Sequence, residues 1–145
     1  MKVQILKENL VKALAVAGRV VSNRGSLEIL SHILLSTEKG RVRVSATNLE
    51  IGINYWIGGK IEKEGDITIP ARLFIDVINS ISSEKIDLEV EEVDVRVKTE
   101  NDNILIKGIS AEEFPVIPSI KGEPTFIIKA SVLNCLLYTS PSPRD

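Results

Sequence analysis

The sequence predicts an α+β fold with largely antiparallel strands, and three observations lead to it. Short runs in which apolar and polar residues alternate are typical of half-buried β-strands. Two amphipathic segments, one after Leu6 and one after Pro70, have helical periodicity. The order strand, helix, three strands occurs twice, which is an internal repeat of roughly sixty residues. Two such units would place six or more strands in sheets and both helices together on one side.

The first unit begins with a short strand at residues 3–6 and continues directly into a helix. The helix is expected to bury one apolar stripe, formed by Leu10, Leu14, Ala17 and Val21. Its other face is small and basic, with Lys12, Ala15, Arg19 and Ser22. A turn at residues 23–26 follows, where Gly25 permits the backbone conformations that a turn requires. Strands are expected at residues 33–37, 41–47 and 50–57, and a polar loop at residues 58–65.

The second unit repeats this order. A strand at residues 67–69 leads to Pro70, where a helix can begin, and residues 71–81 have helical periodicity. The apolar stripe of this helix is Phe74, Val77, Ile78 and Ile81. Three alternating runs follow, at residues 86–90, 93–97 and 104–106. Arg72 and Asn79 lie on the face opposite the stripe, so the two helices would together present a mildly basic surface, suited to a long anion such as duplex DNA.

Composition excludes several classes of protein. The chain of 145 residues has a net charge of -2, one Cys and one His. One Cys cannot form an internal disulfide, and no Cys/His spacing suits a metal, so we expect neither a cofactor nor a metal site. There is no phosphate-binding loop or nucleophile elbow, which argues against an enzyme. No run is long enough to span a membrane and the N-terminus lacks a signal-peptide pattern, so a cytoplasmic domain is expected.

A third unit begins near the C-terminus. Residues 126–133 repeat the apolar positions of residues 3–10, after a stretch rich in Pro and Gly that is typical of a linker. From Tyr138 the chain is expected to leave the helix just begun, because Pro141 and Pro143 fit neither helix nor strand. We therefore predict one domain at residues 1–122, the start of a second at 123–134, and a tail at 135–145 that resembles translated adapter sequence and is predicted to be non-native.

Four short motifs, in this order and spacing, resemble one known family. They are the turn with Arg24 followed by Leu27, Ile29 and Leu30; the run ATNLEI at residues 46–51; the run IPARLF at residues 69–74; and EFP at residues 113–115. Residues 1 to about 134 are similar to the N-terminal domain of the bacterial sliding clamp, the beta subunit of DNA polymerase III.

The resemblance implies a DNA replication processivity factor with a DNA-clamp fold. In that family three copies of the domain form one chain, and two chains close into a homodimeric ring around duplex DNA. Helices line the hole, sheets form the outer wall, and the ring tethers the replicative polymerase without chemistry of its own. The clamp loader and the polymerase bind at regions beyond this chain, which we therefore expect neither to encircle DNA nor to recruit polymerase alone.

The resemblance also implies site residues. Arg24 matches a turn arginine that touches duplex DNA, and Lys12, Arg19 and Arg72 would line the hole and contact phosphates without reading sequence. Ile104 and Ile106 match an apolar pair at the subunit interface. Leu73, Asn101 and Asn103 stand where the family has basic interface groups, so a more apolar interface is expected here.

Each assignment has an alternative in the residues themselves. Arg24 could be an exposed turn arginine without a partner, the basic helix faces could be merely solvated, and Ile104 and Ile106 could be ordinary core residues of an alternating strand. The whole chain could be a stand-alone scaffold or regulatory domain with the clamp fold that forms no ring. A nucleotide-processing enzyme would need a polar cluster in a deep pocket, which alternating strands do not suggest.

Overall fold

The computed structural model describes residues 1–21 and 27–139 of the chain. The first repeat contains the elements β1 (Lys2–Leu6), α1 (Lys7–Gly18), the 3₁₀-helix η1 (Glu28–Ser31), β2 (His32–Glu38), β3 (Arg41–Thr47), β4 (Gly52–Ile57) and β5 (Lys60–Lys63). The second contains β6 (Asp66–Pro70), α2 (Ala71–Ser80), β7 (Lys85–Glu91), β8 (Asp94–Lys98) and β9 (Asn103–Lys107). The 3₁₀-helix η2 (Ala111–Glu113) and the helix α3 (Ala130–Thr139) follow.

The strands form two antiparallel sheets that exchange strands between the repeats. One sheet has the order β5-β1-β7-β8-β9 and the other the order β4-β3-β2-β6. Thus β1 of the first repeat pairs with β7 of the second, with Ile5 opposite Ile86. In return β6 pairs with β2, with Ile33 opposite Ile69. This exchange joins the two repeats into one unit, and the predicted α+β class and the repeat are confirmed.

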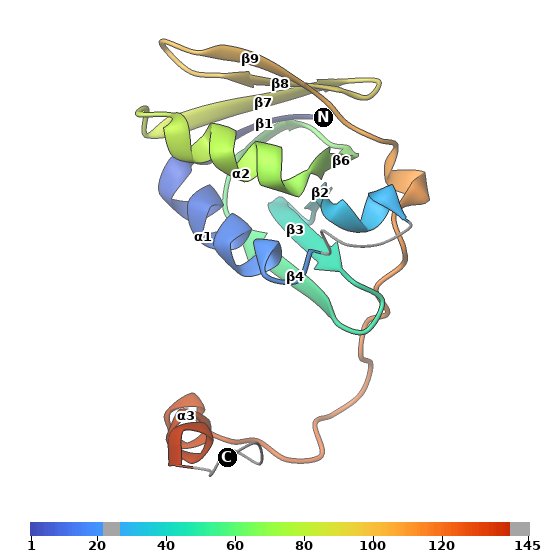
Figure 1. Ribbon diagram of the computed structural model, residues 1–145, viewed down its shortest axis with the longest axis vertical. Helices are drawn as coiled ribbons and strands as arrows, with labels where there is room; N and C mark the ends of the chain where they lie inside the picture. The colour runs from blue at the N-terminus through green and yellow to red at the C-terminus, as the bar shows by residue number, and fades with distance from the viewer. Residues whose placement is uncertain (22–26, 140–145) are drawn as a thin grey trace.

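The helices α1 and α2 lie side by side on the same side of the sheets (Figure 1). α1 contacts β3 and β4, and α2 contacts β6. The largest buried side chains come from both helices and both sheets, and each is at most 2% exposed: Ile5, Leu10, Leu14, Ile33, Leu35, Ile67, Ile69, Phe74, Ile78, Ile81, Ile86 and Leu88. Burial of these apolar groups is the main favourable contribution to folding.

One predicted loop contains a strand. Within residues 58–65, expected to be a polar loop, β5 pairs with β1 and places Ile61 opposite Val3. Ile61 is half-buried and the other three residues of β5 are exposed. A short edge strand with one inward-facing residue has no apolar alternation that would distinguish its sequence from that of a loop. Its pairing with β1 identifies it as a strand.

The first helix is shorter than predicted. α1 ends at Gly18, so Val21, which we placed on its apolar stripe, lies beyond the helix and is half-buried there. Gly18 also allows α2 to approach, because a Cβ at this position would lie 2.9 Å from Cδ1 of Ile75. The predicted turn at residues 23–26 lies outside the described residues.

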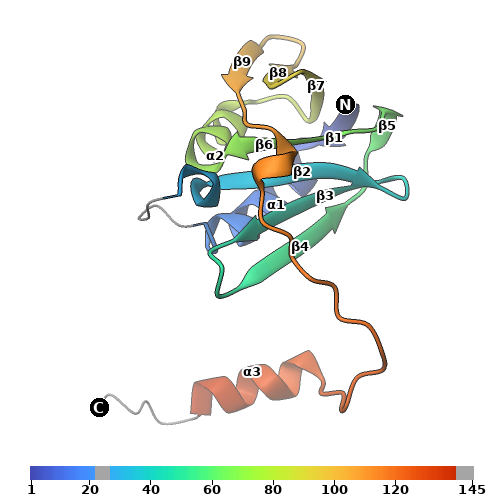
Figure 2. The same ribbon diagram turned by 90° about the vertical axis from the view of Figure 1, so that its right-hand side faces the viewer.

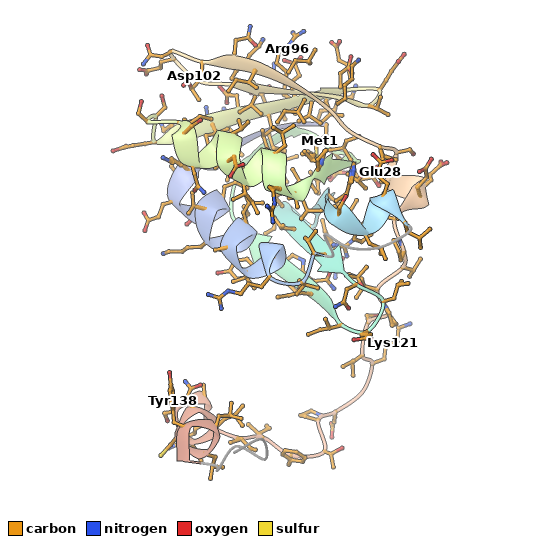
Figure 3. The ribbon with its side chains drawn as sticks, in the orientation of Figure 1. Met1, Glu28, Arg96, Asp102, Lys121 and Tyr138 are labelled. Carbon is orange, nitrogen blue, oxygen red and sulfur yellow. The ribbon has the colours of Figure 1, made fainter. Side chains whose placement is uncertain are left out.

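The C-terminal segment lies apart from the sheets and carries α3 (Figure 2). Its residues 118–138 are all exposed, including Lys121 in the connecting segment and Tyr138 on α3 (Figure 3). Residues 126–129 form no strand, unlike residues 3–6. Tyr138 and Thr139 belong to α3, so the prediction that the helix ends before them is wrong. The domain limits and the non-native origin of residues 135–145 stay predictions.

None of the described helices is long and apolar enough to cross a membrane.

Candidate nucleic-acid interface

The outward stripe of α1 carries two of the predicted basic residues. Glu8, Lys12, Ala15 and Arg19 follow each other at spacings of four and three residues and are all exposed. This spacing keeps them on one face of the helix. The residues on the opposite face, Leu10, Ala13, Leu14 and Ala17, are buried against the rest of the domain. The packing of α1 therefore fixes the direction in which Lys12 and Arg19 point.

The outward face of α2 is built in the same way. Ala71, Phe74 and Ile78 are buried, whereas Arg72, Asp76 and Asn79 are exposed. Pro70, the last residue of β6, is the N-cap residue of the helix and has a non-helical ψ of 118°. Arg72 is consequently held at the beginning of α2, on the surface that α2 shares with α1.

The two faces meet in a shallow cleft between the helices. The cleft has a volume of about 290 Å³ and is lined by Gly18, Val21, Ala71, Arg72, Ile75 and Asp76. It brings Arg72 next to the C-terminal end of α1, which Arg19 follows directly. Lys12, Arg19 and Arg72 are thus exposed on the surface of two helices that pack against each other. We call this surface, with Glu8 and Asp76, the helical face.

The charges of the helical face are mixed. Lys12 forms an ion pair with Glu8, with 3.3 Å between Nζ and Oε1. Within the described part of the chain, Arg19 and Arg72 have no ion-pair partner. The sequence analysis identified the cations but not the two carboxylates, although the spacing of these carboxylates from the cations could have indicated them. Glu8 lies four residues before Lys12 and Asp76 four residues after Arg72, the spacing of facing side chains on a helix.

Arg24, the predicted turn contact, lies outside the described residues. The described chain ends the first helix at Gly18 and resumes before η1 at Leu27, which is 52% exposed. The assignment of Arg24 to DNA contact stays a prediction.

The predicted interface residues lie on β9, an edge strand whose one paired neighbour in the described part of the chain is β8. Ile106 is 2% exposed and belongs to the core, and Ile104 is partly buried against it. The side chain between them, Leu105, is 55% exposed and was not predicted to matter. Of the three positions that lack a basic group, Leu73 is 50% exposed, and Asn101 and Asn103 are also exposed. A partner could therefore contact Ile104 and Ile106 only if its own apolar side chains packed against the core at the edge of the sheet.

Several polar side chains of the four-stranded sheet contact one another. His32 is buried at the start of β2, with Nδ1 3.3 Å from Oγ1 of Thr68, and burial lowers the pKa of its imidazole. On β4, Nε1 of Trp56 donates to Glu38 at 2.9 Å, and this hydrogen bond lowers the pKa of the Glu38 carboxyl. The guanidinium of Arg41 lies 5.8 Å from the centroid of the Trp56 ring. Trp56 is thus engaged by groups of its own sheet.

Comparisons with known proteins show a family to which the chain is similar. Residues 1–118 match the family model described as DNA polymerase III beta subunit, N-terminal domain. The chain is 30% identical over 138 residues to the beta sliding clamp of Pseudomonas aeruginosa, covering 92% of this chain and 37% of that protein. For the beta sliding clamp of Synechococcus elongatus the identity is 28% over 136 residues, covering 92% and 36%.

Solved structures give the same result. The DNA polymerase III subunit beta from Pseudomonas aeruginosa superposes with a TM-score of 0.87 at 30% identity, covering 95% of this chain and 38% of that chain. The Helicobacter pylori beta clamp bound to a DNA ligase peptide has a TM-score of 0.78 at 28% identity, covering 83% and 34%. This chain therefore spans little more than a third of the length of the relatives that it matches.

Proposed function

Because the chain belongs to the family of the DNA polymerase III beta subunit, N-terminal domain, we propose that it forms the first part of a DNA replication processivity factor. In this proposal the complete protein is a homodimeric ring around duplex DNA that tethers the replicative polymerase in the cytoplasm. The polymerase and the clamp loader bind it at regions outside this chain. The protein acts by binding and has no catalytic activity of its own.

One observation supports the proposal above the others: the helical face carries Lys12, Arg19 and Arg72 on two helices that the core holds side by side. A surface that slides along DNA has to attract phosphates without holding one of them or reading a base. Dispersed cations on exposed helix faces meet this requirement, because phosphate contacts carry no sequence information. Arg24, predicted from the resemblance, would add a further DNA contact.

The domain limits support the same assignment. The family model ends at residue 118, inside the first domain that we place at residues 1–122. Residues 123–134 would then begin a second domain, and residues 130–134 of α3 would begin the first helix of that domain. The exposed apolar residues of α3 that precede the predicted non-native tail are Val132 and Leu133, and such a domain would bury them.

Binding of the chain to a short blunt-ended duplex tests the DNA contact. Weak binding at low ionic strength is measured from NMR chemical-shift changes over a series of salt concentrations. The triple variant Lys12→Gln, Arg19→Gln, Arg72→Gln should weaken binding about tenfold or more. It should also lower the slope of log K against log salt by about 0.9 for each phosphate that the variant no longer neutralises.

The matched control removes three cations from the five-stranded sheet, at Lys60, Lys63 and Lys85. These residues are exposed on β5 and β7 and have no ion pair within the described residues. The control should bind the duplex almost as the unaltered chain does. Equal loss in both triple variants would mean that total charge alone governs binding, and the proposal for the helical face would be wrong.

A further inference from the structure

We propose that Glu8 and Asp76 are moderating residues, carboxylates whose charge limits how tightly the helical face holds DNA. This inference rests on the proposed function, because it concerns the strength of the same contact. It assigns a role to two residues that a search for cations overlooks. The observations that carry it are the position, the exposure and the pairing of these two carboxylates.

On α1 the carboxylate is directly paired with a proposed DNA contact. Oε1 of Glu8 lies 3.3 Å from Nζ of Lys12, and the side chains are 77% and 64% exposed. Both belong to the stripe opposite the buried face of α1, so a duplex lying on the helices would meet both. A phosphate that approaches Lys12 has to compete with Glu8 for the ammonium group and is repelled by its carboxylate.

On α2 the carboxylate shares a cleft with a proposed contact. Asp76 and Arg72 both line the cleft between the helices, one turn apart, and both are exposed. Among the described residues Asp76 forms no ion pair, so its charge is not neutralised by a close cation. A phosphate attracted to Arg72 would therefore lie within reach of an uncompensated negative charge.

The charge of the helical face is consequently small. Its described cations are Lys12, Arg19 and Arg72 and its carboxylates Glu8 and Asp76, so three positive charges and two negative ones leave a net charge of +1. An exposed ion pair four residues apart on a helix contributes little to folding, so stability alone gives a weak reason for the arrangement. Interleaved charges of opposite sign flatten the potential along the surface, which lets a polyanion remain attached while it moves.

The test neutralises the carboxylates while keeping their shape. In the same salt-dependent titration, Glu8→Gln and Asp76→Asn should each strengthen binding of the duplex about twofold to threefold. That factor corresponds to one unit charge roughly 8 Å from a phosphate in water. The double variant should bind about fivefold more tightly, and the gain should disappear at high salt, where such interactions are screened.

A double variant on the five-stranded sheet, Glu62→Gln with Asp87→Asn, is the matched control. Glu62 forms an exposed ion pair with Lys2 at 3.4 Å, and Asp87 accepts a hydrogen bond from Gln4 at 3.0 Å. The control changes the net charge by the same amount as the helical-face variant and also removes one exposed ion pair. Its substitutions lie on strands and not on the helices. Its affinity for the duplex should change by much less than that of the helical-face variant.

The possible outcomes separate this inference from the proposed function. Tighter binding by the helical-face variant alone supports it. An equal gain in both double variants overturns it, because net charge would then suffice. No gain in either, while the triple cation variant still weakens binding, overturns the inference and leaves the proposed function standing. If the triple variant does not weaken binding, both are wrong.

Discussion

Gly108 lies so close to Thr68 that a Cβ at Gly108 would overlap the carbonyl oxygen of Thr68. The approach occurs where the chain leaves β9 and crosses from the five-stranded sheet to the four-stranded one. Gly108 N–H donates to the carbonyl of Val93 at 2.7 Å, and Ile109 exchanges two backbone hydrogen bonds with Thr68. The crossing therefore joins both sheets, and it leaves no room for a side chain.

We expect Gly108→Ala to lower the free energy of unfolding by about 1–3 kcal/mol, the usual cost of forcing an extra methyl group into a packed site. Two of the three nearest atoms are the backbone carbonyl oxygens of Thr68 and Val93, which cannot move aside without breaking these hydrogen bonds, and the third is Cγ1 of Ile67. Urea unfolding measures the change. Gly58→Ala is the matched control, because a Cβ there meets no atom within 4 Å. A loss as large in Gly58→Ala would show that glycine flexibility, and not the close approach, is responsible.

The buried His32 should make stability fall in mild acid. Burial lowers the pKa of His32 below its ordinary value of 6.5, against a smaller opposing effect of Glu28. The unfolded chain therefore binds this proton at a higher pH than the folded chain does. The contribution of His32 is fully present above pH 6.5 and is lost as the pH falls through this value towards the lower folded pKa.

The variant His32→Asn checks this dependence, because its amide can still meet the Thr68 hydroxyl without titrating. Urea midpoints of both proteins are compared on either side of the ordinary histidine pKa. The unaltered chain should lose more stability on acidification than the variant, since the carboxylates titrate equally in both. Parallel pH profiles would show that His32 does not contribute.

Much of the fold could be predicted from periodicity, because most elements bury one regular face. The apolar run of β2, the alternation in β3, β7 and β8 and the apolar stripe of α2 identified each element within a few residues. Strand exchange between the repeats could not be predicted this way. The alternation in β1 and β6 shows which face is buried but not which strand lies beside it, so only the tertiary structure reveals their partners.

The helical face could be predicted in part for the same reason. Helical spacing places Lys12, Arg19 and Arg72 outward, but it gives no weight to the carboxylates Glu8 and Asp76 at equivalent positions. For the residues of β9, the spacing shows which side chains are buried but not what buries them. A buried core residue and a buried interface residue have the same pattern in an alternating strand, so spacing alone could not separate the two roles of Ile106.

Lys7 should stabilise the junction of the two helices. Its half-buried ammonium donates to the carbonyl of Ile81 at the C-terminal end of α2, where a positive charge is favoured by the helix dipole. Lys7→Met keeps most of the apolar length but removes the donor. We expect a loss of about 1–2 kcal/mol in urea unfolding. Lys121→Met, at an exposed position of the linker, should change the stability very little. Equal effects would contradict the assignment.

The register of β9 predicts opposite consequences for two adjacent residues. Ile106 is 2% exposed and faces the core beside Val95, its partner on β8, whereas Leu105 is 55% exposed. We expect Ile106→Ala to cost about 2–4 kcal/mol of stability, because it removes buried methyl groups and leaves a cavity. Leu105→Ala should stay within about 0.5 kcal/mol of the unaltered chain.

Urea unfolding of the two variants side by side decides between the possible registers. A shift of one residue would turn every side chain of β9 to the other face of the sheet. Leu105→Ala would then be the costly substitution, and Ile104 and Ile106 would lie outward and be free to meet a partner directly. With the register found here, a partner that pairs along β9 meets the strand's backbone and Leu105 first. Such a partner contacts Ile104 and Ile106 only if its own apolar side chains pack against the core at the edge formed by β9.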